Sequence, residues 1–187
     1  ATDTALLSAA SLWLSGGSLN SNVPGLKLGT SPTLILAGTG GFVGSQNLDL
    51  GSASFSLAAG TNTLTVGANK LTLSSLLSGA GDLVTGGTGT LVLQAANTFT
   101  GALTLGAGIV QVQNASALGA TSASTTVNAG ASLQFQGGIS VAEAMALAGS
   151  GASGQSGALI NLSANNALTG ALPLSAAATL SSDAGTF

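Results

Sequence analysis

The sequence predicts an all-β protein built from short strands that wind into stacked coils. Apolar residues alternate at a spacing of two, and this period places one face of a strand in a core. In mid-chain the inward pairs are Leu91/Leu93, Leu103/Leu105 and Val110/Val112, and the outward residues between them are Val92, Thr104 and Gln111. Glycine-rich turns separate the pairs, because glycine adopts positive φ at no steric cost. Strands that recur roughly every seven to twelve residues, with no helical pattern between them, are typical of a coil of strands, a sandwich or a barrel.

Coil length follows from the strand spacing. Three such strands need roughly 20–25 residues, which lies in the range of β-solenoid repeats. The 187 residues therefore predict a right-handed parallel β-helix of about eight coils. With a rise of ~4.8 Å per coil, the rod is about 40 Å long. We expect residues 1–187 to form one solenoid segment that belongs to a longer repeat protein or fibre.

The N-terminal part fits this pattern after an alanine-rich start (1–10) that allows a short helix or a cap. Leu12 and Leu14 flank an outward Trp13. Further on, the glycine run 38–44 follows a strand, as in the phosphate-binding loop of nucleotide-sugar epimerases. Such a loop needs a helix behind it, whereas another alternating strand follows here. We therefore interpret these glycines as turn residues.

Threonine and asparagine occupy characteristic positions. Thr61, Thr63 and Thr65 alternate with inward residues and form an outward hydroxyl file, although threonine also suits exposed strand positions for its shape alone. Asparagines beside turns are expected either to bond their own backbone or to stack as amide ladders. These are Asn62, Asn97 and Asn128.

Residues 141–147 (VAEAMAL) have the best helix propensity in the chain. The segment is too short to nucleate a helix, and glycines bracket it. We expect a strand with Met145 and Leu147 inward. The remaining inward pairs are Leu34/Leu36, Leu48/Leu50, Phe55/Leu57, Leu64/Val66, Leu71/Leu73, Leu133/Phe135, Ile160/Leu162 and Leu172/Leu174.

Residues 77–112 carry an ordered set of short motifs. They are Gly79-Ala80-Gly81, Gly89-Thr90-Leu91-Val92-Leu93, Ala96-Asn97-Thr98-Phe99-Thr100-Gly101 and Gly106-Ala107-Gly108. This segment resembles the passenger-associated transport repeat of autotransporters and related bacterial surface proteins. It departs from that pattern at Thr85-Gly86 and at Ala102. The resemblance implies a parallel β-helix at a bacterial cell surface and names no ligand.

Composition excludes several classes of protein. Hydrophobic residues make up 45% of the chain and charged residues only 4%, against ~25% in ordinary domains. Disordered chains show the opposite balance, and no apolar run is long enough for a membrane-spanning helix. Two lysines and a net charge of −3 disfavour nucleic acid. So little charge leaves little repulsion between copies, and we expect the chain to associate with itself.

Catalytic chemistry has few candidate groups. The chain has no histidine, cysteine, arginine or tyrosine, so Ser-His-Asp and Cys-His arrangements are impossible. The acids are Asp3, Asp49, Asp82, Glu143 and Asp183. Only Asp49 and Asp82 merit comparison with the carboxylate pair of a glycosidase. We expect the acids to be solvated at turns, and we predict no catalytic, cofactor-binding or metal-binding residues.

The function predicted is that of a non-enzymatic extracellular structural module. Its rigid rod would assemble end to end into a surface filament or stalk. The alternative is an adhesin that recognises glycans or a host surface through a face lined by Thr, Ser and Gln. The candidate surface-binding residues for that alternative are Trp13, Thr61, Thr63 and Thr65.

Overall fold

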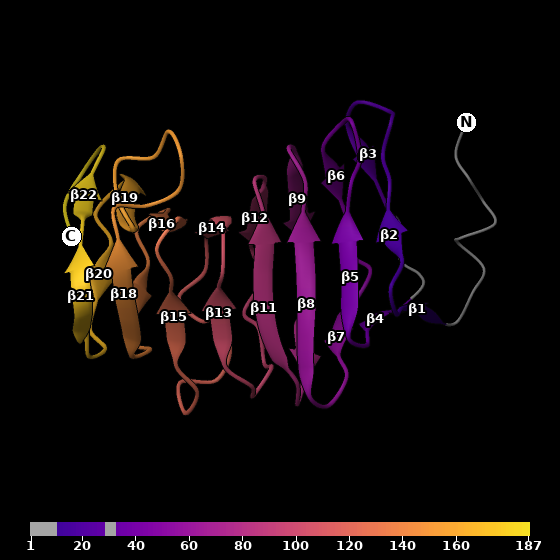
Figure 1. Ribbon diagram of the computed structural model, residues 1–187, viewed down its shortest axis with the longest axis horizontal. Coiled ribbons are helices and arrows are strands. Elements are labelled where there is room, and N and C mark those ends of the chain that lie inside the picture. The colour runs from indigo at the N-terminus through magenta and orange to yellow at the C-terminus, as the bar shows by residue number, and fades with distance from the viewer. Residues whose placement is uncertain (1–10, 29–32) are drawn as a thin grey trace.

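The structure is a computed structural model that describes residues 11–28 and 33–187, and in these residues every regular element is a β-strand (Figure 1). The alanine-rich start and Asp3 lie outside the described residues. No helix that could cross a membrane occurs in the part of the chain described.

The strands form three sides: sheets B and C run through all eight coils, and the third side carries sheet A in the first four coils and sheet D in the last two. Sheet A contains β1 (Ser11–Leu14), β4 (Thr33–Leu36), β7 (Phe55–Leu57) and β10 (Leu77–Gly79). Sheet B contains β2 (Ser18–Leu19), β5 (Thr39–Phe42), β8 (Thr61–Val66), β11 (Asp82–Gly87), β13 (Leu103–Leu105), β15 (Thr125–Val127), β18 (Met145–Gly149) and β21 (Leu174–Ala178). Sheet C contains β3 (Leu26–Lys27), β6 (Leu48–Asp49), β9 (Lys70–Leu73), β12 (Thr90–Leu93), β14 (Gly108–Val112), β16 (Ala131–Gln136), β19 (Leu159–Ser163) and β22 (Leu180–Ser182). Sheet D contains β17 (Ser140–Val141) and β20 (Ala167–Leu168).

The chain is a parallel β-solenoid of about eight turns. Sheets B and C each have eight strands, and their order follows the chain, so each coil adds one strand to each sheet. Strand neighbours run parallel in sheets A to D, as in the pairs β4–β7, β8–β11, β12–β14 and β17–β20. Figure 1 shows the coils succeeding one another along the long axis, from indigo at the N-terminal end to yellow at the C-terminal end. The all-β solenoid and its coil number, predicted from strand spacing, are confirmed.

A continuous apolar column runs through sheet C and shows why the coils stack in register. Each residue of the column pairs with its counterpart in the next coil. The column is Leu26, Leu48, Leu71, Leu91, Val110, Leu133, Leu159 and Leu180. Its members from Leu48 to Leu159 are at most 3% exposed. Burying one such side chain contributes ~1.5–3 kcal/mol, and a slip of one residue would turn the column to solvent.

Most of the predicted inward residues are buried, but the inward pair Ile160/Leu162 is wrong, because Leu159 joins the inward column and Ile160 aligns with Gln134 on the outer face. Met145 and Leu147 are 1% and 0% exposed and lie in β18. The strand with these two residues inward, predicted within residues 141–147, is therefore confirmed. Helix propensity fails there because the inward residues recur every second position, and the neighbouring strand β15 supplies the hydrogen-bond partners.

The prediction of three strands in each coil is wrong for part of the rod. Residues 94–102 and 113–124 complete the third side of their coils without a strand. Backbone hydrogen bonds such as Thr98 N to Leu77 O at 2.9 Å, together with buried side chains, link the coils in this region. Phe99 is fully buried, and Asn97 is 4% exposed.

The glycine run 38–44 was expected to be a turn, and this is wrong for its centre. Gly40 and Gly41 lie in β5, which pairs with β2 and β8. A Cβ atom on Gly40 would lie 2.6 Å from the Leu36 side chain and 3.2 Å from Leu14 Cβ. Gly40 is therefore a closely packed inward position, whereas a Cβ atom on Gly41 would lie 3.1 Å from the backbone oxygen of Thr65 in the next coil. Gly38 adopts φ +91° and does turn the chain.

Two residues predicted to face outward are nevertheless buried. Val92 is 2% exposed and Gln111 is 6% exposed. They are register partners on neighbouring strands of sheet C, on the opposite face from the apolar column. Side chains stacked one strand spacing apart on this face cover one another, so alternation gives the correct face but not the exposure.

Asparagines join the coils from within the corners. Asn97 Oδ1 accepts a hydrogen bond from Leu77 N at 2.9 Å, and Asn97 Nδ2 donates to Ala117 O at 2.6 Å. Asn62 bonds Gly38 of the preceding coil in the same way, at 3.0 Å. Asn128, by contrast, is exposed. Two of the three asparagines therefore bond backbone across coils, and they form no amide ladder with one another.

Candidate functional site

The predicted surface-binding residues lie on two different sheets. Trp13 is on β1 of sheet A, 60% exposed, beside Ile35 of the next strand. Thr61 and Thr65 are exposed and Thr63 is half-buried on β8 of sheet B. The structure therefore brings the three threonines together but separates them from Trp13.

Thr63 belongs to a longer column on sheet B. In register with it, on successive strands, lie Thr39, Val84, Thr104 and Thr126. The sequence contains these residues at coil spacing, but only the register shows that they align. The column is an uncharged face of hydroxyl and methyl groups.

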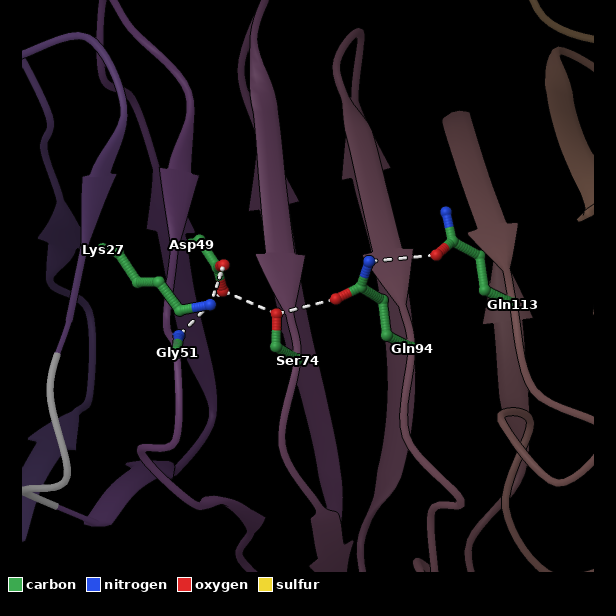
Figure 2. A network of polar contacts seen from close by, with 6 residues as sticks. All are labelled: Lys27, Asp49, Gly51, Ser74, Gln94 and Gln113. Carbon is green, nitrogen blue, oxygen red and sulfur yellow. Dashed lines mark hydrogen bonds and ion pairs between the residues drawn. The ribbon is translucent and has the colours of Figure 1, made fainter.

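A second polar surface, on sheet C, was not predicted. We call it the polar track; it consists of Lys27, Asp49, Ser74, Gln94, Gln113 and Gln136, and Figure 2 shows all of them except Gln136. One residue comes from each of six successive coils, and the track runs along the rod. The sequence signal that could have revealed it is a polar residue every 19 to 25 positions, directly after or within a strand.

Asp49 is the centre of the charged end of the track. Its Oδ2 lies 3.0 Å from Lys27 Nζ, and its Oδ1 accepts hydrogen bonds from Gly51 N at 2.8 Å and Ser74 Oγ at 2.7 Å (Figure 2). Partial burial acts to raise the pKa of Asp49, but the hydrogen bonds from Ser74 and Gly51 and the nearby Lys27 outweigh it. The pKa of Asp49 is therefore held below its usual value.

The rest of the track is a chain of neutral groups. Ser74 Oγ also lies 2.7 Å from Gln94 Oε1, and because a hydroxyl has one proton it donates to Asp49 or to Gln94 at any moment. Gln94 Nε2 donates to Gln113 Oε1 at 2.9 Å, and Gln113 Nε2 donates to Gln136 Oε1 at 2.9 Å. These bonds link side chains of successive coils on the outer face.

An open pocket of about 330 Å³ lies beside the charged end of the track. It is lined by Lys27, Gly51, Ser52, Ser74 and Ser75. The pairing of Lys27 with Asp49 neutralises its one cation. The pocket can offer hydroxyl groups to a neutral, hydroxyl-rich ligand, and its lining includes no pair of acids for general acid–base chemistry.

The acids are dispersed over the rod, and the prediction of solvated acids at turns is wrong for three of them: Asp49 and Asp82 are half-buried in strands β6 and β11, and Glu143 is buried. Asp49 lies on sheet C and Asp82 on sheet B, so the structure does not pair them. Asp82 Oδ1 accepts a hydrogen bond from Ala102 N at 2.8 Å. Glu143 is buried, 2% exposed, between β17 and β18. Val141 and Met145, two residues before and after it, are also buried. Glu143 follows the same alternation, so its side chain is turned away from solvent.

Within residues 11–28 and 33–187, no three acids lie close enough to hold a metal ion.

Fold and surface together define the class of this protein as a parallel β-solenoid whose outer faces carry few charges. Comparison of the chain with protein-family models, with curated proteins and with solved structures found no match in any of the three. The resemblance of residues 77–112 to the autotransporter repeat therefore stays a prediction.

Proposed function

We propose that this chain is a non-enzymatic structural module of the bacterial cell surface, a stiff rod that associates end to end into a filament or stalk. One observation carries the proposal: apolar residues that belong inside a coil are exposed at the C-terminal end of the solenoid. The extracellular, bacterial setting rests on the resemblance of residues 77–112 to autotransporter repeats.

The exposed residues are Leu174 and Leu180. Leu174 pairs in register with Leu147, and Leu180 pairs with Leu159. Leu147 and Leu159 are 0% and 1% exposed, because a further coil covers them, whereas Leu174 and Leu180 are 54% and 44% exposed. The same inward positions, one coil later, thus present leucines without a covering layer. A further coil would bury them as it buries their counterparts.

The backbone of this coil supports the same conclusion. In the described residues β21 pairs with β18 and β22 pairs with β19, each on one side only. An unpaired parallel edge presents N–H and C=O groups to any strand in register. Neither β21 nor β22 contains a charged residue that would oppose such pairing. The second copy would supply its first coil, which continues the solenoid in the same direction.

Sedimentation velocity over a wide range of concentrations tests the proposal. The wild-type chain is expected to shift to larger species as concentration rises, and a Leu174→Lys/Leu180→Lys variant is expected to remain monomeric. Leu76→Lys is the matched control, because Leu76 is 38% exposed just before β10, in the fourth coil and away from both ends of the rod. A wild-type chain that stays monomeric throughout, or a double variant that associates like the wild type, contradicts the proposal.

A second candidate function is adhesion through the threonine column of sheet B. The observation that favours it is the alignment of Thr39, Thr63, Thr104 and Thr126 in one register, with Val84 between them, in a column that has no charged member. Binding to a glycan array that is lost on Thr63→Lys/Thr104→Lys, with the fold intact, would support adhesion. Trp13→Ala tests the separate exposed tryptophan on sheet A. Glycan binding that neither variant changes would contradict a role for the threonine column and for Trp13.

A further inference from the structure

Glu143 is the one ionisable residue of a long uncharged stretch. Between Asp82 and Asp183 no other acid and no lysine occurs in the sequence. Glu143 is nevertheless buried, on the turn that leads from β17 into β18. It therefore lies in the seventh coil, one coil before the exposed leucines of the C-terminal end.

The carboxyl group is only half satisfied. Thr125 Oγ1 donates to Glu143 Oε1 at 2.6 Å, while Glu143 Oε2 has no hydrogen-bond partner in the described residues. Thr125 belongs to β15, the strand that pairs directly with β18. The contact thus joins the turn before β18 to the preceding coil through one side-chain hydrogen bond.

No charged group faces this carboxyl. The packed elements β13, β15, β17, β18, β20 and β21 contain no Asp, Glu, Lys or Arg. Asp183, the nearest acid in the following coil, is exposed and bonds Ser156 Oγ at 2.7 Å. Burial without a counter-ion penalises the charged form and raises the pKa of Glu143 to about 7, although the Thr125 hydrogen bond acts in the opposite direction.

We propose that ionisation of Glu143 loosens the turn between β17 and β18 and opens the last two coils, so that the protonation state of one side chain controls the C-terminal end of the rod. The neutral acid is compatible with the dry interior. The carboxylate needs water, which can reach it only if the turn separates from β15. The opened coils no longer present β21 and β22 in register, so end-to-end association, which rests on the proposed function, weakens as pH rises.

The sign of the effect follows from the two states. The folded carboxyl holds its proton up to about pH 7, whereas an unfolded glutamate releases it near 4.5. The unfolded or opened state therefore binds fewer protons in this interval, and stability falls as pH rises from 4.5 through 7. Below 4.5 both states are protonated, and the stabilisation is fully present.

Hydrogen exchange measured by mass spectrometry tests the proposal on the dilute full chain, before any association. At about pH 8.5, after correction for intrinsic exchange rates, amides of β18 and β21 in the wild type are expected to lose protection by roughly tenfold or more relative to about pH 5.5. Amides of β8 and β9 should not change. Glu143→Gln is expected to abolish the pH dependence, and Asp183→Asn, the matched exposed control, to retain it.

A second variant keeps the test decisive if Glu143→Gln does not fold. Thr125→Val removes the hydrogen bond that favours the carboxylate, so the midpoint of opening should move to higher pH. Wild-type protection that does not depend on pH, or a midpoint that Thr125→Val leaves in place, overturns the proposal. Because exchange is measured on single chains, pH-dependent opening without any association would retain the role of Glu143 and reject end-to-end assembly.

Discussion

Asn97 Nδ2 donates a hydrogen bond to the carbonyl oxygen of Ala117, 2.6 Å away in the following coil. On the other side its Oδ1 accepts from Leu77 N of the preceding coil at 2.9 Å. One buried side chain thus satisfies backbone groups of two neighbouring coils in the region where the third side has no strand. The side chain adds to the backbone hydrogen bonds that link these coils, such as Thr98 N to Leu77 O at 2.9 Å and Thr100 N to Gly79 O at 3.0 Å.

Replacing Asn97 by Ala should lower the free energy of unfolding by about 2–4 kcal/mol, because two buried backbone groups lose their partners. Urea denaturation measures the change. Asn97→Asp keeps the shape but loses the donor to Ala117, so it should also destabilise. Asn128→Ala, at an exposed position, should change stability by less than about 0.5 kcal/mol. Equal effects at the two asparagines would contradict the bridging role.

Gly101→Ala should prevent the coils from closing to their normal spacing. A Cβ atom there would lie 2.2 Å from Gly81 O and 2.6 Å from Asp82 N, which are rigid backbone atoms of the preceding coil. Gly17→Ala is the matched control, since nothing lies within 4 Å of its Cβ position. Thermal unfolding should show a large loss for Gly101→Ala and almost none for Gly17→Ala. A tolerated alanine at position 101 would mean that the coils are less closely stacked than described.

Phe99→Ala should lower stability by about 3–5 kcal/mol through loss of apolar contact and the cavity left behind. Phe99 is 0% exposed and fills a corner that no strand occupies. Val43→Ala, at a side chain that is 58% exposed, supplies the surface comparison. Guanidinium denaturation of both variants checks the difference, and a small loss for Phe99→Ala would show that the corner is not part of the core.

Asp49→Asn should alter the acid limb of the stability curve. The pKa of Asp49 is lowered in the folded chain, so its contribution is present above the ordinary value of 3.8 and is lost as pH falls through the folded pKa. The variant should be slightly less stable than the wild type at neutral pH and equal to it in strong acid. Because the ion pair with Lys27 is largely exposed, the difference should not exceed about 1 kcal/mol. A difference that persists in strong acid would contradict this reading.

Strand alternation predicted most of the fold. Pairs such as Leu91/Leu93 and Leu103/Leu105 gave both the core and the coil length, because period two and a repeat near twenty residues are properties of the chain itself. The strand at Met145 was predicted on the same basis.

What the sequence could not predict depends on neighbours in other coils. Gly40 and Gly41 were predicted to form a turn, because the packing of Gly40 against Leu36 and of Gly41 against Thr65 of the next coil is invisible along the chain. The polar track needs the register that aligns Ser74 with Gln94, and burial of Glu143 needs the strands that surround it. Alternation along one strand predicted the threonine file Thr61, Thr63 and Thr65. The threonines that align with it in other coils, and its separation from Trp13, depend on register between coils and were not predicted.

Directional end-to-end stacking can be tested by oxidative cross-linking of single cysteine variants. Register through sheet C aligns Lys27 of the first coil with Ser181 of the last, so these two positions would become neighbours across a head-to-tail junction. The chain has no cysteine of its own, and the two sites lie roughly 34 Å apart within one rod, too far for an internal disulfide. A mixture of Lys27→Cys and Ser181→Cys should give mainly the mixed dimer, and the double variant should give a ladder of oligomers. Only monomers, or like-with-like dimers in equal or greater amount, would contradict the account.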